Sequence, residues 1–373
     1  MKKYIGIVLL ACLVWTCSSD NGGSDNDGGK KGKFDRKAML TNWADNIIIP
    51  SYAAFFTEIS NLKTAFQDFE STTDQPNLET LRAAWLKAYK SWQHVSMFEI
   101  GPAETAGLRY SINIYPTNTE KIEGYVISGT YDFTLSSNRV AKGFPALDYL
   151  LNGLGDTDEA ILAKYTSGTT GSNYKSYVND VIVDIEELTN EVTSGWAGDY
   201  RDTFINNDGA SATASVDKFV NDYIFYYEKF LRAGKMGIPL GAFSGVKSTK
   251  HVEALYKKDV SKELFLEGLN ASQDFFNGKH FGKSTKGESL NSYLKALNSV
   301  KDGADLGELI NNQFNKARTS VNNLDAFLEE LSVDGTKQML LAYDEVQRIV
   351  PFFKVDMVSA MSISIDYVDA DGD

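Results

Sequence analysis

Apolar side chains recur every three or four residues over long stretches of the chain from Phe34 onward, without sustained alternation. This spacing places them on one face of a helix, whereas alternation would indicate strands. The pattern therefore predicts a mainly helical protein. The expected helices cover residues 35–68, 77–99, 119–128, 144–152, 173–194, 212–236, 248–277, 288–299, 304–331 and 335–365.

Glycine and proline mark the ends of several of these helices. Gly101-Pro102 and Gly237-Ile238-Pro239 each follow a periodic stretch, at places where these residues stop helix propagation. The stretch TSGTTGSN, residues 166–173, is the best candidate for an internal linker. An all-α fold of two helical bundles packed side by side, over residues 34–165 and 174–373, is then the economical solution.

The chain begins MKKYIGIVLLACLVWTC, which has the charged start, short apolar run and cysteine of a secretory signal. A polar stretch follows, so we expect a signal peptide over residues 1–17 and a flexible tether over residues 18–33. A cysteine at such a cleavage point resembles the acylated residue of a bacterial lipoprotein. The polar stretch favours Cys17, whereas the small residues before Cys12 fit the usual cleavage pattern better. Acidic residues so soon after the cysteine resemble the surface-export signal of Bacteroidetes lipoproteins.

Composition and charge narrow the class of protein. The 373 residues are 43% hydrophobic and 12% aromatic, which suffices for a sizeable core and is not typical of a disordered chain. The formal net charge is −13, so the chain lacks the excess of lysine and arginine with which proteins bind nucleic-acid phosphates. We therefore expect no nucleic-acid partner.

The helix expected over residues 77–99 carries an aromatic stripe that ends in a carboxylate. Trp85, Trp92 and Glu99 follow one another at intervals of seven residues, nearly two helical turns, so they share one face. A carboxylate on an apolar face has to be paired, protonated or used in binding, because burying a bare charge is costly. The alternative is that Glu99 reaches solvent where the helix frays. If the face is a binding site, Glu99 supplies a polar contact and Trp92 an apolar wall.

Two further stretches allow both a structural and a binding interpretation. Tyr115 lies in YPTNTE, whose threonines and asparagine can cap a helix that begins near Glu120. Arg232 and Lys235 follow an aromatic stripe near the end of the helix expected over residues 212–236, where cations favour the helix dipole. At the edge of an open cleft, the same two cations could instead hold an anionic ligand.

The residues offer little for nucleophilic or histidine-based metal chemistry. Histidine occurs only at positions 94, 251 and 280, each isolated in the sequence, and no HExxH pair is present. A carboxylate site for a hard cation stays open, although 50 acidic residues make chance clusters expected. No GxSxG motif and no Walker loop occurs.

Several stretches, in their order and spacing, resemble the imelysin family, also classed as M75 peptidases. The resemblance extends over nearly all of the chain that follows the N-terminal segment. The matching stretches are AWLKAYKSWQHVSMFEIGP (84–102), INIYPTNTEKIEG (112–124), KGFPALDYLL (142–151), LRAGKMGIPLG (231–241) and the closing SISIDYVDADGD.

The family's GxHxxE motif, proposed to bind a metal, is degenerate in KGFPALDYLL. Gly143 matches its glycine, Pro145 stands in place of its histidine and Asp148 replaces its glutamate. The proline ring offers no ligand atom, although it suits the first turn of a helix. Iron or another divalent metal would therefore need Asp148 together with a further oxygen, such as that of Glu99.

The resemblance implies an all-α fold of two bundle-like halves, export to the bacterial envelope and a link to iron acquisition. We expect an outer-membrane lipoprotein, anchored by its lipid and facing the periplasm or the cell surface. It would bind a small ligand or an iron chelate, haem included, in the cleft between the halves, and would not be an active peptidase. The expected ligand contacts are Trp92, Glu99, Tyr115, Gly143, Pro145, Asp148, Arg232 and Lys235.

Two other functions stay open at this point. The first is a metal-dependent peptidase of the M75 type that uses Asp148 and Glu99 with other oxygens. The second is a partner-binding component of an outer-membrane uptake system, which works with a transporter and needs no small ligand.

Overall fold

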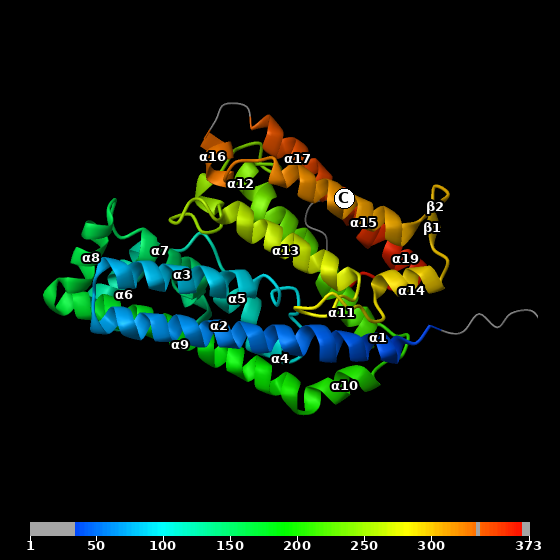
Figure 1. The fold of residues 1–373 in the computed structure, drawn as a ribbon, viewed down its shortest axis with the longest axis horizontal. Helices are drawn as coiled ribbons and strands as arrows, with labels where there is room; N and C mark the ends of the chain where they lie inside the picture. Colours follow the sequence, from blue (N-terminus) through cyan, green and yellow to red (C-terminus); the bar gives the residue numbers. More distant parts are fainter. Residues whose placement is uncertain (1–33, 333–335, 368–373) are drawn as a thin grey trace, which may run out of the picture. The chain divides into compact units, whose positions relative to one another are not determined.

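Helices form most of the structure, as the hydrophobic periodicity predicts (Figure 1). The computed structural model describes residues 34–332 and 336–367. The all-α class is confirmed, and the strands are limited, within these residues, to one short antiparallel hairpin. From the N-terminal side the helices are α1 (Arg36–Asn42), η1 (Trp43–Ile48), α2 (Ile49–Ser71), α3 (Gln75–Trp92), α4 (Pro102–Ala106), α5 (Leu108–Ile112), α6 (Thr119–Ser128), η2 (Ser136–Ala141), α7 (Gly143–Asn152), α8 (Asp158–Thr166), α9 (Gly168–Gly195), η3 (Trp196–Tyr200) and α10 (Arg201–Asn206).

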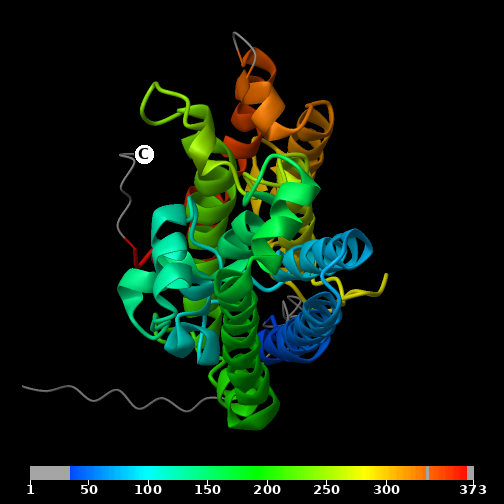
Figure 2. The same cartoon turned by 90° about the vertical axis from the view of Figure 1, so that its left-hand side faces the viewer.

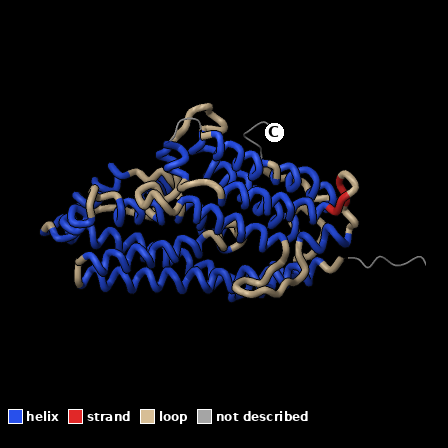
Figure 3. The backbone as a smooth tube through the Cα atoms, turned by 45° about the horizontal axis from the view of Figure 1, so that its top comes forward, coloured by secondary structure: helices blue, strands red, loops and turns tan. Residues whose placement is uncertain are grey.

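The remaining helices follow a loop after α10. They are α11 (Ser215–Phe225), η4 (Tyr226–Gly237), α12 (Ile238–Leu240), η5 (Thr249–His251), α13 (Ser261–Phe276), α14 (Leu290–Ala296), α15 (Leu306–Asn322), α16 (Phe327–Ser332), α17 (Lys337–Gln347), α18 (Ile349–Pro351), η6 (Phe352–Met357) and α19 (Val358–Met361). The hairpin of β1 (Val300–Lys301) and β2 (Ala304–Asp305) lies between α14 and α15 and is drawn in red in Figure 3.

Three long helices, α2, α3 and α9, pack together and bury their apolar stripes (Figure 2). On α2, Phe55, Ile59 and Phe66 recur at helical spacing, and solvent reaches none of them. α3 begins where the sequence supplies an aspartate cap, because the Asp74 carboxylate accepts the Asn77 backbone N–H at 3.0 Å. Amphipathic stripes and caps thus explain this part of the fold.

A continuous helical segment runs from α11 through η4 to α12 and carries the aromatic stripe of the second part of the chain. Phe219, Tyr223 and Tyr226 are buried, and the ring of Tyr223 packs 5.3 Å from that of Phe275 on α13. The stripe is therefore core, as its helical spacing indicates. η4 is π-helical over all twelve of its residues.

The linker expected at residues 166–173 is helical in the structure. Only Ser167 separates α8 from α9, and the glycines and threonines that follow form the first turns of α9. Tertiary packing explains the difference, because α9 lies against α2, α7 and α8. The described residues from Phe34 onward form one compact unit. The division into two halves at that point stays a prediction.

Other departures from the predicted helices occur where turns interrupt the apolar periodicity. Residues 252–260, expected inside a helix, form turns, and α13 begins only at Ser261. The hairpin fills the gap left between the helices expected over residues 288–299 and 304–331, with Asp302 and Gly303 at positive φ in its turn, and it delays the start of α15 to Leu306. The short helices α4, α5, α8 and α10 contain too few turns for a periodicity to predict them.

None of the described helices is both long enough and apolar enough to span a bilayer. The predicted signal peptide, the tether and the acylation at Cys17 or Cys12 lie outside the described residues.

Candidate functional site

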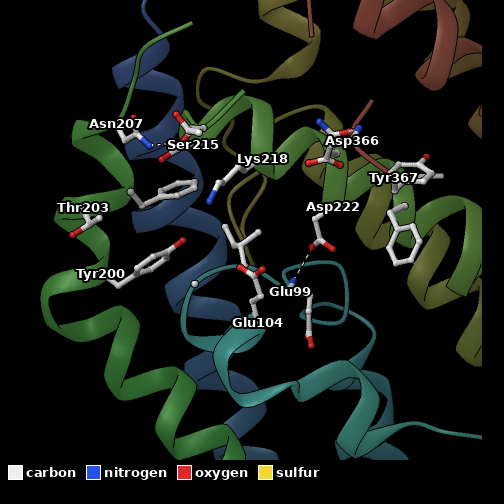
Figure 4. A pocket seen from close by; sticks show the side chains of 16 residues that line it. Glu99, Glu104, Tyr200, Thr203, Asn207, Ser215, Lys218, Asp222, Asp366 and Tyr367 are labelled. Atoms are coloured by element: carbon white, nitrogen blue, oxygen red, sulfur yellow. Dashed lines mark hydrogen bonds between the residues drawn. The ribbon is translucent and has the colours of Figure 1, made fainter. Parts of the chain in front are cut away.

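A cavity of about 560 Å³ opens beside Glu99 (Figure 4). We call it the Glu99 cavity. Its walls come from the loop that leads into α4, from η3 and α10, from α11 and from the last described residues. The lining residues are Glu99, Ile100, Gly101, Glu104, Tyr200, Thr203, Phe204, Asn207, Thr213, Ser215, Lys218, Asn221, Asp222, Phe225, Asp366 and Tyr367.

Gly101 gives the cavity one of its aromatic walls. Its φ is +55°, a backbone conformation that favours glycine, and a Cβ built on it would lie 2.0 Å from Cζ of Tyr200. The absent side chain therefore lets the Tyr200 ring lie against the backbone. Trp196 packs edge-on against the same ring at 4.9 Å, which fixes the ring from the other side.

Glu99 sits in the loop after α3, because that helix ends at Trp92 and not at residue 99. Both of its carboxylate oxygens accept the Arg109 backbone N–H, at 2.9 and 3.1 Å, and its own N–H donates to Asp222 at 2.8 Å. Burial raises the pKa of Glu99 to about 7, against the opposing effect of the Arg109 charge. Of the predicted alternatives, the structure shows a partly buried, hydrogen-bonded carboxylate on a residue that lines a cavity.

Arg109 and Asp222 form the ion pair that holds this wall together. The guanidinium donates to both oxygens of Asp222, at 2.9 and 3.0 Å, and to the Ser96 carbonyl at 2.7 Å. It also lies 4.9 Å from the centre of the Phe230 ring. A bidentate pair of this kind joins α5 to α11 with a defined geometry.

The degenerate motif forms a closed structural site on α7. Asp148 is 1% exposed, and its carboxylate accepts the backbone N–H groups of Tyr256 at 2.8 Å and Lys257 at 2.9 Å, as well as the Asn152 amide at 3.2 Å. Burial raises the pKa of Asp148 to about 7, although these hydrogen bonds oppose the rise. Asp148 therefore braces the turns of residues 252–260 against α7.

Gly143 and Pro145 also have packing roles. Gly143 has φ +76°, and a Cβ there would lie 2.0 Å from the Ile112 carbonyl oxygen. Pro145 is buried in the first turn of α7, where its missing N–H costs no hydrogen bond. Because Pro145 offers no ligand atom and both oxygens of Asp148 are used, these residues do not fit a metal. None of the three lines the Glu99 cavity.

Trp92, Tyr115 and Lys235 meet at a second, much smaller cavity of about 20 Å³, room for about one water molecule. The Lys235 ammonium forms an ion pair with Glu253, a buried carboxylate that also accepts the Asn113 amide at 2.9 Å. Burial lowers the pKa of Lys235, while Glu253 opposes that shift. Lys235 is thus already paired. The capping interpretation of YPTNTE is confirmed, because Asn118 caps α6 and accepts the Lys121 N–H at 2.9 Å.

Arg232 faces a different neighbourhood from Lys235. Its guanidinium donates to the Gln347 amide oxygen at 2.6 Å and to the Tyr343 hydroxyl at 3.1 Å, both on α17. It also lies 3.6 Å from the buried Glu228 carboxylate. The two cations are therefore not joined at one anion site, because Arg232 lies beside Glu228 whereas Lys235 is paired with Glu253.

Metal coordination finds no support in the described side chains. Within residues 34–332 and 336–367, no group of three or more His, Cys, Asp or Glu side chains is arranged to hold a metal ion. Glu99 and Asp148, the expected oxygen pair, accept hydrogen bonds from different segments. His94 and His280, isolated in the sequence, line one cavity of about 290 Å³, and His94 is hydrogen-bonded to Glu267 at 2.7 Å.

Sequence reasoning missed most of the residues around Glu99. Asp222 carried a usable signal, since it stands among the apolar neighbours of a predicted helix, as Glu99 does. Arg109, Tyr200, Ser215 and Lys218 carried none, because tertiary packing alone brings their segments together.

Comparison with known proteins supplies a family and a fold. The sequence model of the imelysin family, peptidase M75, matches residues 48–350. Iron-regulated protein A of Synechococcus elongatus is 26% identical over 120 residues, which are 31% of this chain and 33% of that protein. The chain thus matches about a third of the length of this curated relative.

Two solved structures share the fold. One, assigned provisionally as an iron-regulated protein A precursor from Parabacteroides distasonis, has a TM-score of 0.71 at 16% identity, covering 87% of this chain and 95% of its own. The other, an imelysin-like protein from Psychrobacter arcticum, has a TM-score of 0.68 at 17% identity, covering 89% and 97%. At these identities the likeness concerns the fold alone.

Proposed function

The chain belongs to the imelysin family, and from this premise we propose that it is a binding protein for an iron-containing ligand, which it takes up in the Glu99 cavity. The observation that carries the proposal is the contrast between two carboxylates. Asp148, in the family motif, is enclosed and fully hydrogen-bonded, whereas Glu99 lines a cavity large enough for a small chelate.

The link to iron rests on the relatives. Two of the matching proteins carry the name iron-regulated protein A. A cavity of about 560 Å³ lies within the usual size range of small-molecule sites, which supports a chelate or a cofactor better than a bare ion. Within residues 34–332 and 336–367, no group of three or more His, Cys, Asp or Glu side chains is arranged to hold a bare metal ion, which supports the same choice.

The proposal includes the place where the protein works. Acylation at Cys17 would tie it to the outer membrane, with residues 18–33 as a tether and the folded part facing the periplasm or the cell surface. In that position the protein would deliver its ligand to an outer-membrane transporter.

Thermal unfolding of the purified protein with four probes tests the function. The probes are ferrous iron, ferric citrate, haemin and ferrioxamine B. A probe that binds the native state raises the midpoint saturably, by about 2.7 kcal/mol of stabilisation at a hundredfold excess over its dissociation constant. We expect such a shift with at least one probe, and a shift with none of them would refute the proposal.

A matched pair of variants locates the site. Thr203 and Thr64 are both exposed, helical, and donate their hydroxyls to the carbonyl four residues earlier, but only Thr203 lines the Glu99 cavity. Thr203→Trp should fill the cavity and abolish the shift, while Thr64→Trp should keep it. A shift that survives in Thr203→Trp would place the ligand elsewhere. Chelator-sensitive hydrolysis of casein by the purified protein would favour the peptidase instead.

A further inference from the structure

We infer that the ligand of the Glu99 cavity carries a positive charge, in the form of an ammonium or guanidinium group. The inference rests on the proposed function and names the chemical class of its ligand.

The side chains that line the Glu99 cavity carry more negative than positive charge. Four carboxylates line the cavity, on Glu99, Glu104, Asp222 and Asp366, and within the described residues Lys218 is the one cation among the lining side chains. Arg109 neutralises Asp222 from behind the wall. The side chains of Glu104 and Asp366 form no ion pair with any described residue, and both residues are exposed. After Lys218 offsets one carboxylate, a negative excess faces the cavity, which attracts a cationic group.

The aromatic walls favour the same class of ligand. The Tyr200 and Phe204 rings lie 6.3 Å apart on one side, and the Phe225 and Tyr367 rings lie 5.1 Å apart on the other. Aromatic faces attract organic cations, and a site that combines them with carboxylates recognises a substituted ammonium by both its charge and its carbon skeleton. Burial raises the pKa of Tyr200 to about 12, so its phenol stays neutral.

An unused polar group points into the same space. Ser215 is 7% exposed and lines the cavity, yet its hydroxyl makes no hydrogen bond with any described residue. Its backbone N–H is occupied by the Asn207 carbonyl at 3.0 Å, so the hydroxyl is the group left for a ligand (Figure 4). The hydroxyl has no protein partner to give up, and it can accept a hydrogen bond from an ammonium N–H.

The contribution of the ligand's positive charge to binding can be measured with two chelates that differ only in that charge. Ferrioxamine B carries a free ammonium group, and its N-acetyl derivative differs only by the loss of that charge. By titration calorimetry, we expect the protein to bind ferrioxamine B at least tenfold more tightly at low salt. Glu104→Gln/Asp366→Asn should reduce the ratio, while Glu191→Gln, an exposed change on α9 outside the cavity, should leave it unchanged. Equal or tighter binding of the acetylated form would overturn the inference.

A second measurement separates this inference from the proposed function, because it needs no iron ligand. The sequence has only two cysteines, Cys12 and Cys17, so Thr203→Cys in a Cys12→Ser/Cys17→Ser full-length chain carries a single thiol in the cavity. Its reaction rates with a trimethylammonium and a sulfonate methanethiosulfonate reagent report the local potential. We expect the cationic reagent to be favoured at least tenfold over the ratio measured at Thr64→Cys.

The two measurements distinguish a failure of the proposed function from a failure of the inferred ligand charge. A cation preference at Thr203→Cys without binding of any iron probe would retain a cationic ligand and refute the link to iron. Iron-chelate binding without that preference would retain the proposed function and overturn the charge class.

Discussion

Asp148 and Glu99 are two carboxylates whose pKa burial raises to about 7, but their surroundings differ. Asp148 accepts hydrogen bonds on both oxygens from two successive backbone N–H groups and an amide, and is 1% exposed. Glu99 accepts one backbone N–H with both oxygens, and the residue lines a cavity of about 560 Å³.

The difference shows that a perturbed pKa alone does not mark a functional carboxylate. Burial is the largest cause of the shift at both residues, so the shift reports desolvation in each case. What separates them is whether the hydrogen-bonding capacity is already used. The contrast supports a structural role for the motif residue Asp148 and is the reason why we propose a binding role for Glu99, which lies outside the motif.

The largest effect should come from the one motif residue that this chain retains. Gly143→Ala places a Cβ 2.0 Å from the Ile112 carbonyl oxygen at φ +76°, so both overlap and backbone strain should destabilise the fold by about 3 kcal/mol. Urea unfolding measures the change. Gly124→Ala is the control, since a Cβ there meets nothing within 4 Å on a helix, and it should stabilise by up to about 1 kcal/mol. Equal midpoints for the two variants would show that Gly143 is not a packing residue.

Asp148→Asn should have the next largest effect. An amide oxygen can accept only on one side, so the Tyr256 or the Lys257 N–H would face an amide N–H and lose its partner. Leaving a buried donor unpaired costs about 1–3 kcal/mol, again measurable by urea unfolding. Ligand stabilisation should persist in this variant. If Asp148→Asn instead lost ligand binding at unchanged stability, Asp148 would have to be a ligand contact and not a packing residue.

Sequence reasoning reached the fold class and the motif but only part of the site. The helical period and the cap at Asn118 are local properties, so residues 119–128 were predicted with the bounds that α6 has. The carboxylate of Glu99 stood out on an apolar face for the same local reason. Asp222 carried the same local signal, but its pairing with Arg109 could not be predicted, because the two residues lie 113 positions apart in the sequence and meet only through packing. The burial of Asp148 is likewise set by turns that replaced a predicted helix.

The pH dependence of stability should follow from the shared pKa shift. Because both folded carboxyls titrate near 7 and unfolded ones near 4, the native state binds more protons than the unfolded state between these values. Stability should therefore fall as pH rises from about 4 to 7, by at most about 1.4 kcal/mol per pH unit for each group, and level off above 7. Asp148→Asn should remove part of this slope in urea unfolding followed over pH. An unchanged slope would contradict the shared shift.

Glu99→Gln should change stability least, yet it sharpens the comparison most. The glutamine amide oxygen can keep the Arg109 N–H that both carboxylate oxygens now share, so the loss should stay below about 1 kcal/mol. Binding of ferrioxamine B should respond instead. In the unmodified protein its affinity should rise as pH passes through about 7, because Glu99 gains the charge that attracts the ammonium. In Glu99→Gln that rise should be absent, whereas in Asp148→Asn it should remain. A rise that disappears in Asp148→Asn and survives in Glu99→Gln would reverse the two roles.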